Sequence, residues 1–128
     1  MQYAVLWLEN MDKKENKIVR ITMNFAVRIV KLYKYLCDEK KEYVLSKQLL
    51  RCGTGIGANV SEAQHGQTDA DFGTKMNIAL KEANETKYWL ELLHNTEYLT
   101  KQEYDSLLVD IIEIKNILIA IVKKIFKP

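Results

Sequence analysis

The sequence predicts an all-α protein, folded as an antiparallel up-and-down four-helix bundle. Apolar residues recur every three or four positions through four long segments, which is the spacing of one buried helical face. Proline occurs only at Pro128, so no proline interrupts a helix earlier in the chain. No segment alternates between apolar and polar residues for long enough to indicate a strand. Short connections between the helices favour antiparallel neighbours.

The first predicted helix covers about residues 16–38. Its apolar positions follow the helical period from Ile18 to Leu36. They spread over an arc of about 200°, which is wider than the core of one small bundle needs. The remaining strip of the helix carries basic residues and no acidic one: Lys17, Arg20, Arg28, Lys31 and Lys34.

The second predicted helix covers about residues 43–65 and contains three glycines. The helical period continues through Gly53, Gly55 and Gly57, although a glycine inside a helix costs roughly 0.5–1 kcal/mol relative to alanine. Gly53 and Gly57 lie four residues apart on one side of the helix. We predict that these two glycines let a neighbouring helix pack closely. We expect Gly66 to end this helix, at the position where a left-handed backbone favours glycine.

The third predicted helix covers about residues 69–95, and the fourth covers about residues 101–126. Thr68 with Asp71 resembles a capping box, and Thr100 with Glu103 forms a second one; each marks a helix start. The fourth helix is apolar around more than half of its circumference. Because exposed apolar surface of that size usually marks a contact, we expect the first and fourth helices to form the interface of a homo-oligomer.

Composition and length indicate one ordinary globular domain. The 128 residues are 48% hydrophobic and 28% charged, with a net charge of +2. We expect residues 1–15 to be an N-terminal extension and residues 16–128 to be the bundle domain. No apolar run approaches the ~20 residues that span a bilayer, so no membrane partner is expected. Cys37 and Cys52 lack the spacing of a metal site, which favours a reduced, cytoplasmic protein.

Two Glu-x-x-His motifs are the sharpest hint of metal chemistry. Glu62 and Glu91 precede His65 and His94 by three residues, a spacing found in di-iron bundle proteins. Both motifs end consecutive antiparallel helices, and roughly 33 Å of helix separates the turn at residues 66–68 from the second motif. One metal pair cannot join sites so far apart within one chain. We therefore expect no metal and no cofactor.

Other catalytic patterns are weaker still. The glycine-rich run lacks the Gly-Lys-Ser/Thr ending and the preceding strand of a phosphate-binding loop. Cys52 lies on a buried line with no histidine near it in the sequence. Ser61 lies close to His65, but no third group is evident to orient the histidine. We therefore predict no catalytic residue and a protein that is not an enzyme.

The alternative function is sequence-independent binding of RNA or DNA. Lys47 and Arg51, on the outer face of the second helix, would join the basic strip of the first helix. Repeated around an oligomer, these cations would form a ring that binds phosphate backbones without reading bases.

The block of residues 50–93 resembles a known family of four-helix bundles. The resemblance rests on residues 49–51, the run from Gly55 to Ala63, residues 71–72, and the runs from Ile78 to Ala83 and from Glu85 to Leu90. The segment from Phe25 to Tyr33 fits as well. This family includes the proteins encoded by intervening sequences in bacterial large-subunit ribosomal RNA genes.

The resemblance implies a small antiparallel bundle that assembles. Relatives, including the accessory protein of diversity-generating retroelements, form five-membered rings, so the resemblance implies a pentamer. That accessory protein works with a reverse transcriptase and binds nucleic acid through a basic surface. The family supplies no catalytic residues. We interpret the chain as a non-enzymatic oligomeric interaction module whose biochemical activity is unknown and whose partner is a protein or an RNA.

Overall fold

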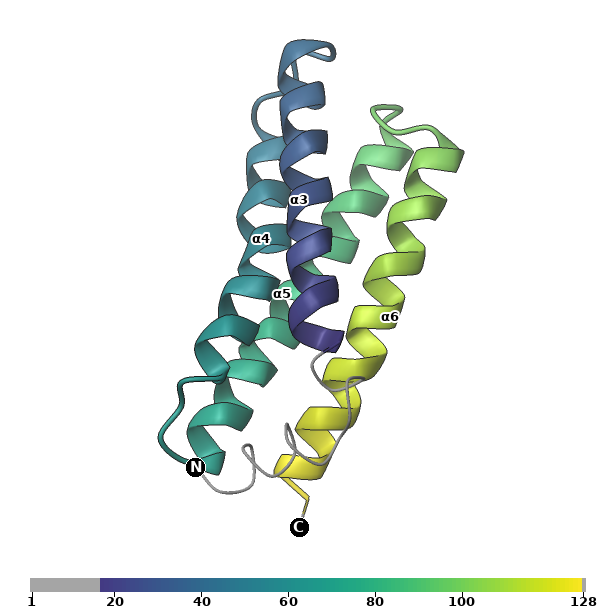
Figure 1. The fold of residues 1–128 in the computed structure, drawn as a ribbon. Coiled ribbons are helices and arrows are strands. Elements are labelled where there is room, and N and C mark those ends of the chain that lie inside the picture. Colours follow the sequence, from purple (N-terminus) through teal and green to yellow (C-terminus); the bar gives the residue numbers. More distant parts are fainter. Residues whose placement is uncertain (1–16, 128) are drawn as a thin grey trace.

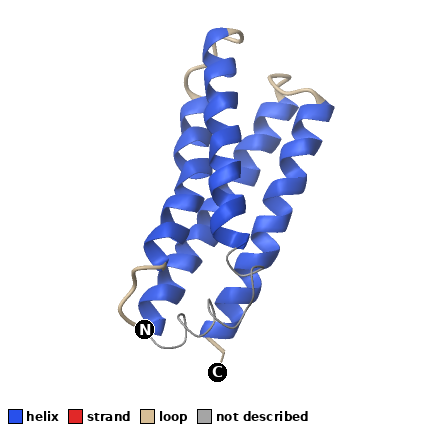
Figure 2. Cartoon of the chain, viewed as in Figure 1, coloured by secondary structure: helices blue, strands red, loops and turns tan. Residues whose placement is uncertain are grey.

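The computed structural model describes residues 17–127, which form four helices with no strand among them (Figures 1 and 2). Under the labels of Figure 1, the helices are α3 (Lys17–Asp38), α4 (Leu45–Ala63), α5 (Asp69–Asn95) and α6 (Lys101–Ile125). The predicted all-α bundle is thus confirmed. The expected extension, residues 1–15, lies outside the described residues.

Consecutive helices run in opposite directions and pack side by side (Figure 1). α4 lies between α3 and α5, and α5 lies between α4 and α6. α3 and α6 close the bundle, but they touch along a much shorter line than the three consecutive pairs do. The seam between the first and the last helix is therefore the loosest part of the fold.

The core is built from the apolar positions that the helical period predicts. Phe25, Ile29, Ile56, Phe72 and Leu118 are all fully or almost fully buried. The core extends through all four helices to Leu99, in the connection before α6. Packing of the four apolar faces into one continuous core, more than helix propensity, stabilises these helices.

Two helix starts use a threonine cap, as the sequence predicts. At α6, the hydroxyl of Thr100 accepts the Glu103 N–H at 3.1 Å, and the Glu103 carboxylate accepts the Thr100 N–H at 2.8 Å. This complete capping box confirms the prediction. At α5, the hydroxyl of Thr68 accepts the Asp71 N–H at 3.0 Å. Each bond satisfies a backbone donor that the helix itself cannot pair.

The start of α4 is capped by Glu42, which lies between the first and the second predicted helix. The Glu42 side chain is buried and accepts the backbone N–H groups of Leu45 and Ser46, both at 2.8 Å, and of Val44 at 3.2 Å. Burial by itself would raise the pKa of Glu42, but the bonds from these three N–H groups and from the Ser46 side chain together outweigh it and lower the pKa. Glu42 is therefore held as a carboxylate at the positive end of α4.

The expected role of Gly66 is wrong. No glycine among residues 17–127 has a positive φ, and α4 ends at Ala63. The helix closes instead with a tight turn, in which the N–H of Gly66 donates to the Ala63 carbonyl at 3.1 Å. Glycine fits here for a different reason: a Cβ would lie 3.2 Å from the Asp71 Cβ and from the Phe72 nitrogen.

Within the described range, no helix is both long enough and apolar enough to cross a membrane.

Candidate functional site

The basic strip predicted on the first helix divides into paired and unpaired cations. Lys17 reaches across the loose seam to Glu113 on α6, with a separation of 2.8 Å between the charged atoms. Arg28 reaches the same helix, where it binds the Asp110 carboxylate and the Ser106 hydroxyl. These two cations hold α3 to α6, so their charges are partly satisfied within the chain.

The same division holds on α4. Arg51 pairs with Glu85 and lies 3.6 Å from a carboxylate oxygen of Glu82, both on α5. The Trp89 indole N–H also donates to Glu85, at 3.0 Å. Four predicted cations remain exposed, with no ion pair to any residue between 17 and 127: Arg20, Lys31, Lys34 and Lys47.

The cluster around Arg51 lies between α4 and α5 and is partly buried. Burial raises the pKa of Glu82, and the positive charge of Arg51 acts in the opposite direction. Burial likewise raises the pKa of the Cys52 thiol to about 11. Because the thiolate is the reactive form of cysteine, Cys52 is held in its unreactive state near neutral pH.

The predicted close-packing glycines lie against α3. A Cβ at Gly53 would lie 3.0 Å from side-chain atoms of Ile29. A Cβ at Gly57 would lie 3.2 Å from the backbone oxygen of Thr22. Sequence reasoning missed Gly73 on α5, where a Cβ would lie 2.5 Å from Ile125 on α6. A single glycine without a regular spacing offers no signal in the sequence, because its neighbour is more than fifty residues away.

The two Glu-x-x-His motifs lie at opposite ends of the bundle, at the C-terminal ends of α4 and α5 (Figure 1). Glu62 pairs with Lys75 on α5 at 3.1 Å. The His94 ring stacks on Tyr104 with centroids 4.7 Å apart, and its Nδ1 lies 3.2 Å from the Leu99 carbonyl oxygen. In the part of the chain that the structure describes, no three histidine, cysteine or acidic residues are grouped so that they could hold a metal ion.

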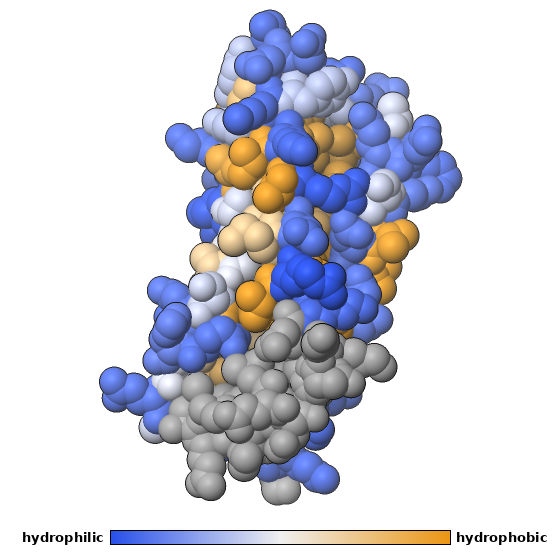
Figure 3. All heavy atoms as spheres, viewed as in Figure 1, coloured by the Kyte–Doolittle hydropathy of each residue, from blue (hydrophilic) through white to orange (hydrophobic). Residues whose placement is uncertain are grey.

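Two outer faces of the bundle expose apolar side chains in rows. On α3, Val19, Met23 and Val27 follow one another at intervals of four residues and are 37%, 64% and 46% exposed. We call this row the α3 stripe. On α6, Val109 and Ile112 are 69% and 43% exposed, and we call them the α6 stripe. Figure 3 shows apolar patches along the middle of the face formed by α3, and another at the edge formed by α6.

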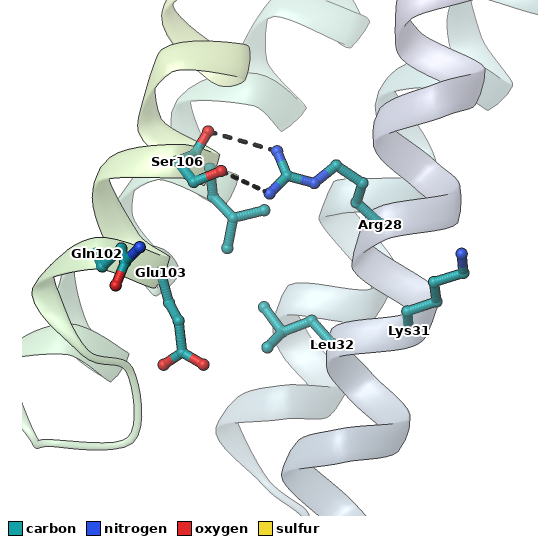
Figure 4. Close-up of a pocket in the computed structure, with 7 residues that line it drawn as sticks. Arg28, Lys31, Leu32, Gln102, Glu103 and Ser106 are labelled. Atoms are coloured by element: carbon teal, nitrogen blue, oxygen red, sulfur yellow. Dashed lines mark hydrogen bonds between the residues drawn. The ribbon is translucent and has the colours of Figure 1, made fainter.

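A groove of about 410 Å³ opens where α3 and α6 diverge. Figure 4 shows Arg28 bridging it to Ser106, with Leu32 between the two helices and Lys31 pointing away from α6. Its other lining residues on α6 include Glu103, whose carboxylate is already engaged in the capping box. The groove is shallow and its charged groups are mostly satisfied, so the exposed stripes are the stronger candidates for an interaction surface.

Comparisons with known proteins agree with this architecture. The model of the family described as "23S rRNA-intervening sequence protein" matches residues 14–120. A solved structure of a protein of unknown function from the S23 ribosomal protein family of Bacteroides thetaiotaomicron is 57% identical in sequence, with a TM-score of 0.84. The match covers 86% of this chain and 98% of that one. No curated protein matches. With the family model spanning most of the sequence and the same bundle in a close structural relative, this chain belongs to the 23S rRNA-intervening sequence protein family.

Proposed function

We propose that this protein is a non-enzymatic interaction module that works as a homo-oligomer in the cytoplasm. In this proposal the α3 and α6 stripes are the contact surfaces between copies. The resemblance to ring-forming relatives supports a pentamer as the assembled size. The free thiols of Cys37 and Cys52 support a reducing compartment.

The strongest support for a contact between copies is the α3 stripe. Single exposed apolar residues are common on protein surfaces and need no explanation. Val19, Met23 and Val27 are different because steps of four residues align them along one side of a helix. A continuous row of this kind, over about two and a half turns of helix, is the surface that a second helix covers in a bundle. Here no helix within residues 17–127 covers it.

The mass of the protein in solution tests this proposal. We expect sedimentation equilibrium to show an oligomer at micromolar concentration. A variant with Met23→Glu and Val27→Glu should sediment as a smaller species, because it places two charges in the contact. The matched control is Val44→Lys, which changes an apolar side chain that is 71% exposed but lies outside both stripes. We expect this control to keep the wild-type mass.

A wild-type protein that sediments as a monomer throughout the micromolar range would contradict the proposal. Circular dichroism should show that each variant keeps its helical content. All three substituted side chains are exposed, so none removes a core contact.

Direct binding of nucleic acid is the second candidate. It is favoured by four exposed cations that have no ion pair within residues 17–127: Arg20, Lys31, Lys34 and Lys47. It is weaker than the first candidate because Lys17, Arg28 and Arg51 form ion pairs with α5 or α6.

A further inference from the structure

The four helices form two hairpins that meet along one extensive contact and one short contact. The first hairpin consists of α3 and α4, and the second consists of α5 and α6. α4 and α5 make the most extensive contact of the bundle, whereas α3 and α6 make the shortest. Figure 1 shows α3 and α6 diverging towards the ends that carry the two hairpin connections. The hairpins are therefore held firmly along α4 and α5 and weakly along the contact between α3 and α6, which we call the α3–α6 seam.

The α3–α6 seam has a hollow on each side of Arg28. The groove of about 410 Å³ lies on one side, and its lining includes Leu32 and Leu107. A smaller hollow of about 130 Å³ lies on the other side, and its lining includes Phe25 and Ile114. Open space replaces packed side chains at both places, so the dispersion attraction between α3 and α6 is reduced there.

Two ion pairs cross the α3–α6 seam. Arg28 binds the Asp110 carboxylate, and Lys17 Nζ lies 2.8 Å from a carboxylate oxygen of Glu113. These four side chains are between 36% and 47% exposed. An exposed ion pair favours the form that contains it by a factor of roughly 1.5–5, and salt weakens it. The two pairs therefore favour a closed seam without locking it.

We infer that these two ion pairs act as a latch, and that the two hairpins open about the contact between α4 and α5 when the latch releases. Opening makes the buried floor of the seam accessible, including Phe25, Leu107 and Ile114. The α3 stripe belongs to one hairpin and the α6 stripe to the other, so opening also changes the orientation of one stripe relative to the other. The latch thereby couples ionic strength to the relative orientation of the two exposed stripes.

A cysteine placed in the seam tests the latch. Ile114→Cys puts a thiol in the smaller hollow, at a position where the native side chain is 1% exposed. N-ethylmaleimide reacts with this thiol when the seam is open, and the mass of the labelled peptide gives the rate. The native Cys52 is the matched control in the same molecule, because it is fully buried and contacts Thr86 on α5. Each thiol is compared only with itself between variants, since the pKa of Cys52 is raised.

We expect Arg28→Gln to raise the labelling rate at position 114 by roughly two- to fivefold, because one exposed ion pair is lost. Salt at about 1 M should also raise this rate, since the screening length falls to about 3 Å. The effect of salt should be smaller when Arg28→Gln and Lys17→Gln are combined, because no latch then remains to be weakened. The labelling rate of Cys52 should stay constant throughout.

The control substitution is Lys75→Gln, which removes an ion pair of similar exposure. Lys75 pairs with Glu62 across the contact between α4 and α5, not across the seam. We expect Lys75→Gln to leave the labelling rates of both thiols unchanged. Circular dichroism identifies any variant that fails to fold. Leu107→Cys then replaces Ile114→Cys and reports from the other hollow, with the same pattern of rates expected.

Two outcomes would overturn the latch. One is a parallel rise in labelling at position 114 and at Cys52, which would mean that the whole molecule unfolds and the seam does not open separately. The other is an unchanged rate at position 114 in Arg28→Gln, which would mean that apolar packing alone closes the seam. A monomeric wild type would contradict the proposed homo-oligomer but would leave the latch standing, because labelling at position 114 requires only one copy.

Discussion

At the scale of single residues, Glu42 stabilises the fold in a way that the sequence did not reveal. Its carboxylate binds three backbone N–H groups at the start of α4. We expect Glu42→Ala to lower the free energy of unfolding by about 1–2 kcal/mol, because buried N–H groups lose a charged acceptor. Urea titration followed by circular dichroism measures the change, at one fixed protein concentration since assembly also affects stability.

The pH dependence of unfolding distinguishes the charge of Glu42 from its shape. The pKa of Glu42 is lowered in the folded state. Its stabilising contribution is therefore complete above the pKa of the unfolded chain, about 4.3. The contribution is lost as the pH falls through the lower pKa of the folded state. Glu42→Gln keeps one acceptor oxygen and cannot titrate. We expect Gln to cost less than Ala, and the difference from the wild type to shrink on acidification. Equal losses for Gln at all pH values would contradict the assigned charge.

At the scale of elements, α4 depends on the absence of side chains where it meets α3. Replacing glycine by alanine inside a helix should add about 1 kcal/mol of stability from helix propensity alone. At Gly57 the added Cβ meets the backbone of Thr22, which cannot rotate away as a side chain can. We expect Gly57→Ala to cancel this gain and to destabilise the protein by up to about 2 kcal/mol, because overpacking typically costs 1–3 kcal/mol.

Gly55 is the matched control on the same helix. An added Cβ there would lie 3.4 Å from the Glu82 side chain, which is an ordinary contact. We expect Gly55→Ala to be neutral or to stabilise the protein by up to about 1 kcal/mol. Thermal unfolding of the two variants measures the contrast. If both alanines stabilise equally, close packing is not the reason for Gly57.

At the scale of the whole molecule, the distribution of ion pairs limits how the protein can bind nucleic acid. Four of the seven predicted cations are free of ion pairs within residues 17–127. The logarithm of the affinity for single-stranded RNA should therefore fall with the logarithm of salt concentration with a slope no steeper than about −3 per copy. Fluorescence anisotropy of a labelled RNA measures this slope.

Two substitutions accompany that measurement. Lys31→Gln should weaken any binding and flatten the slope, because Lys31 is exposed and has no ion pair with any residue between 17 and 127. Arg51→Gln should leave the slope unchanged, because Arg51 is held by Glu82 and Glu85. A steeper slope, or an equal effect of both substitutions, would show that the paired cations also contact RNA.

Much of the fold could be predicted from the sequence because its signals are local. The third helix begins at Asp69 and ends at Asn95, as its period and its threonine cap predict. The capping box of Thr100 and Glu103 is read from two residues three positions apart. Glu42 was missed because it lies two residues before the N-cap residue Val44, and glutamate is not among the residue types that mark a helix start there.

The candidate surfaces could be predicted only in part. The excess of apolar residues on the first helix is visible in the sequence, since it depends on the helical period alone. Which of its cations remain free is not visible. Lys17 and Arg28 form ion pairs with acidic residues of α6 that lie more than eighty residues away in the sequence. Lys31 belongs to the same predicted strip but points away from that helix.

The sequence by itself determined the class of the fold, the approximate extent of the helices and the family, because each depends on the order and spacing of nearby residues. Only the tertiary structure decided which cations are paired, which buried carboxylate caps α4, and which apolar rows remain uncovered on the outer faces of α3 and α6. Those features depend on how helices that are distant in sequence are oriented around a common core. A helical period specifies the side of a helix that is buried, but it does not specify the neighbour that each remaining side meets.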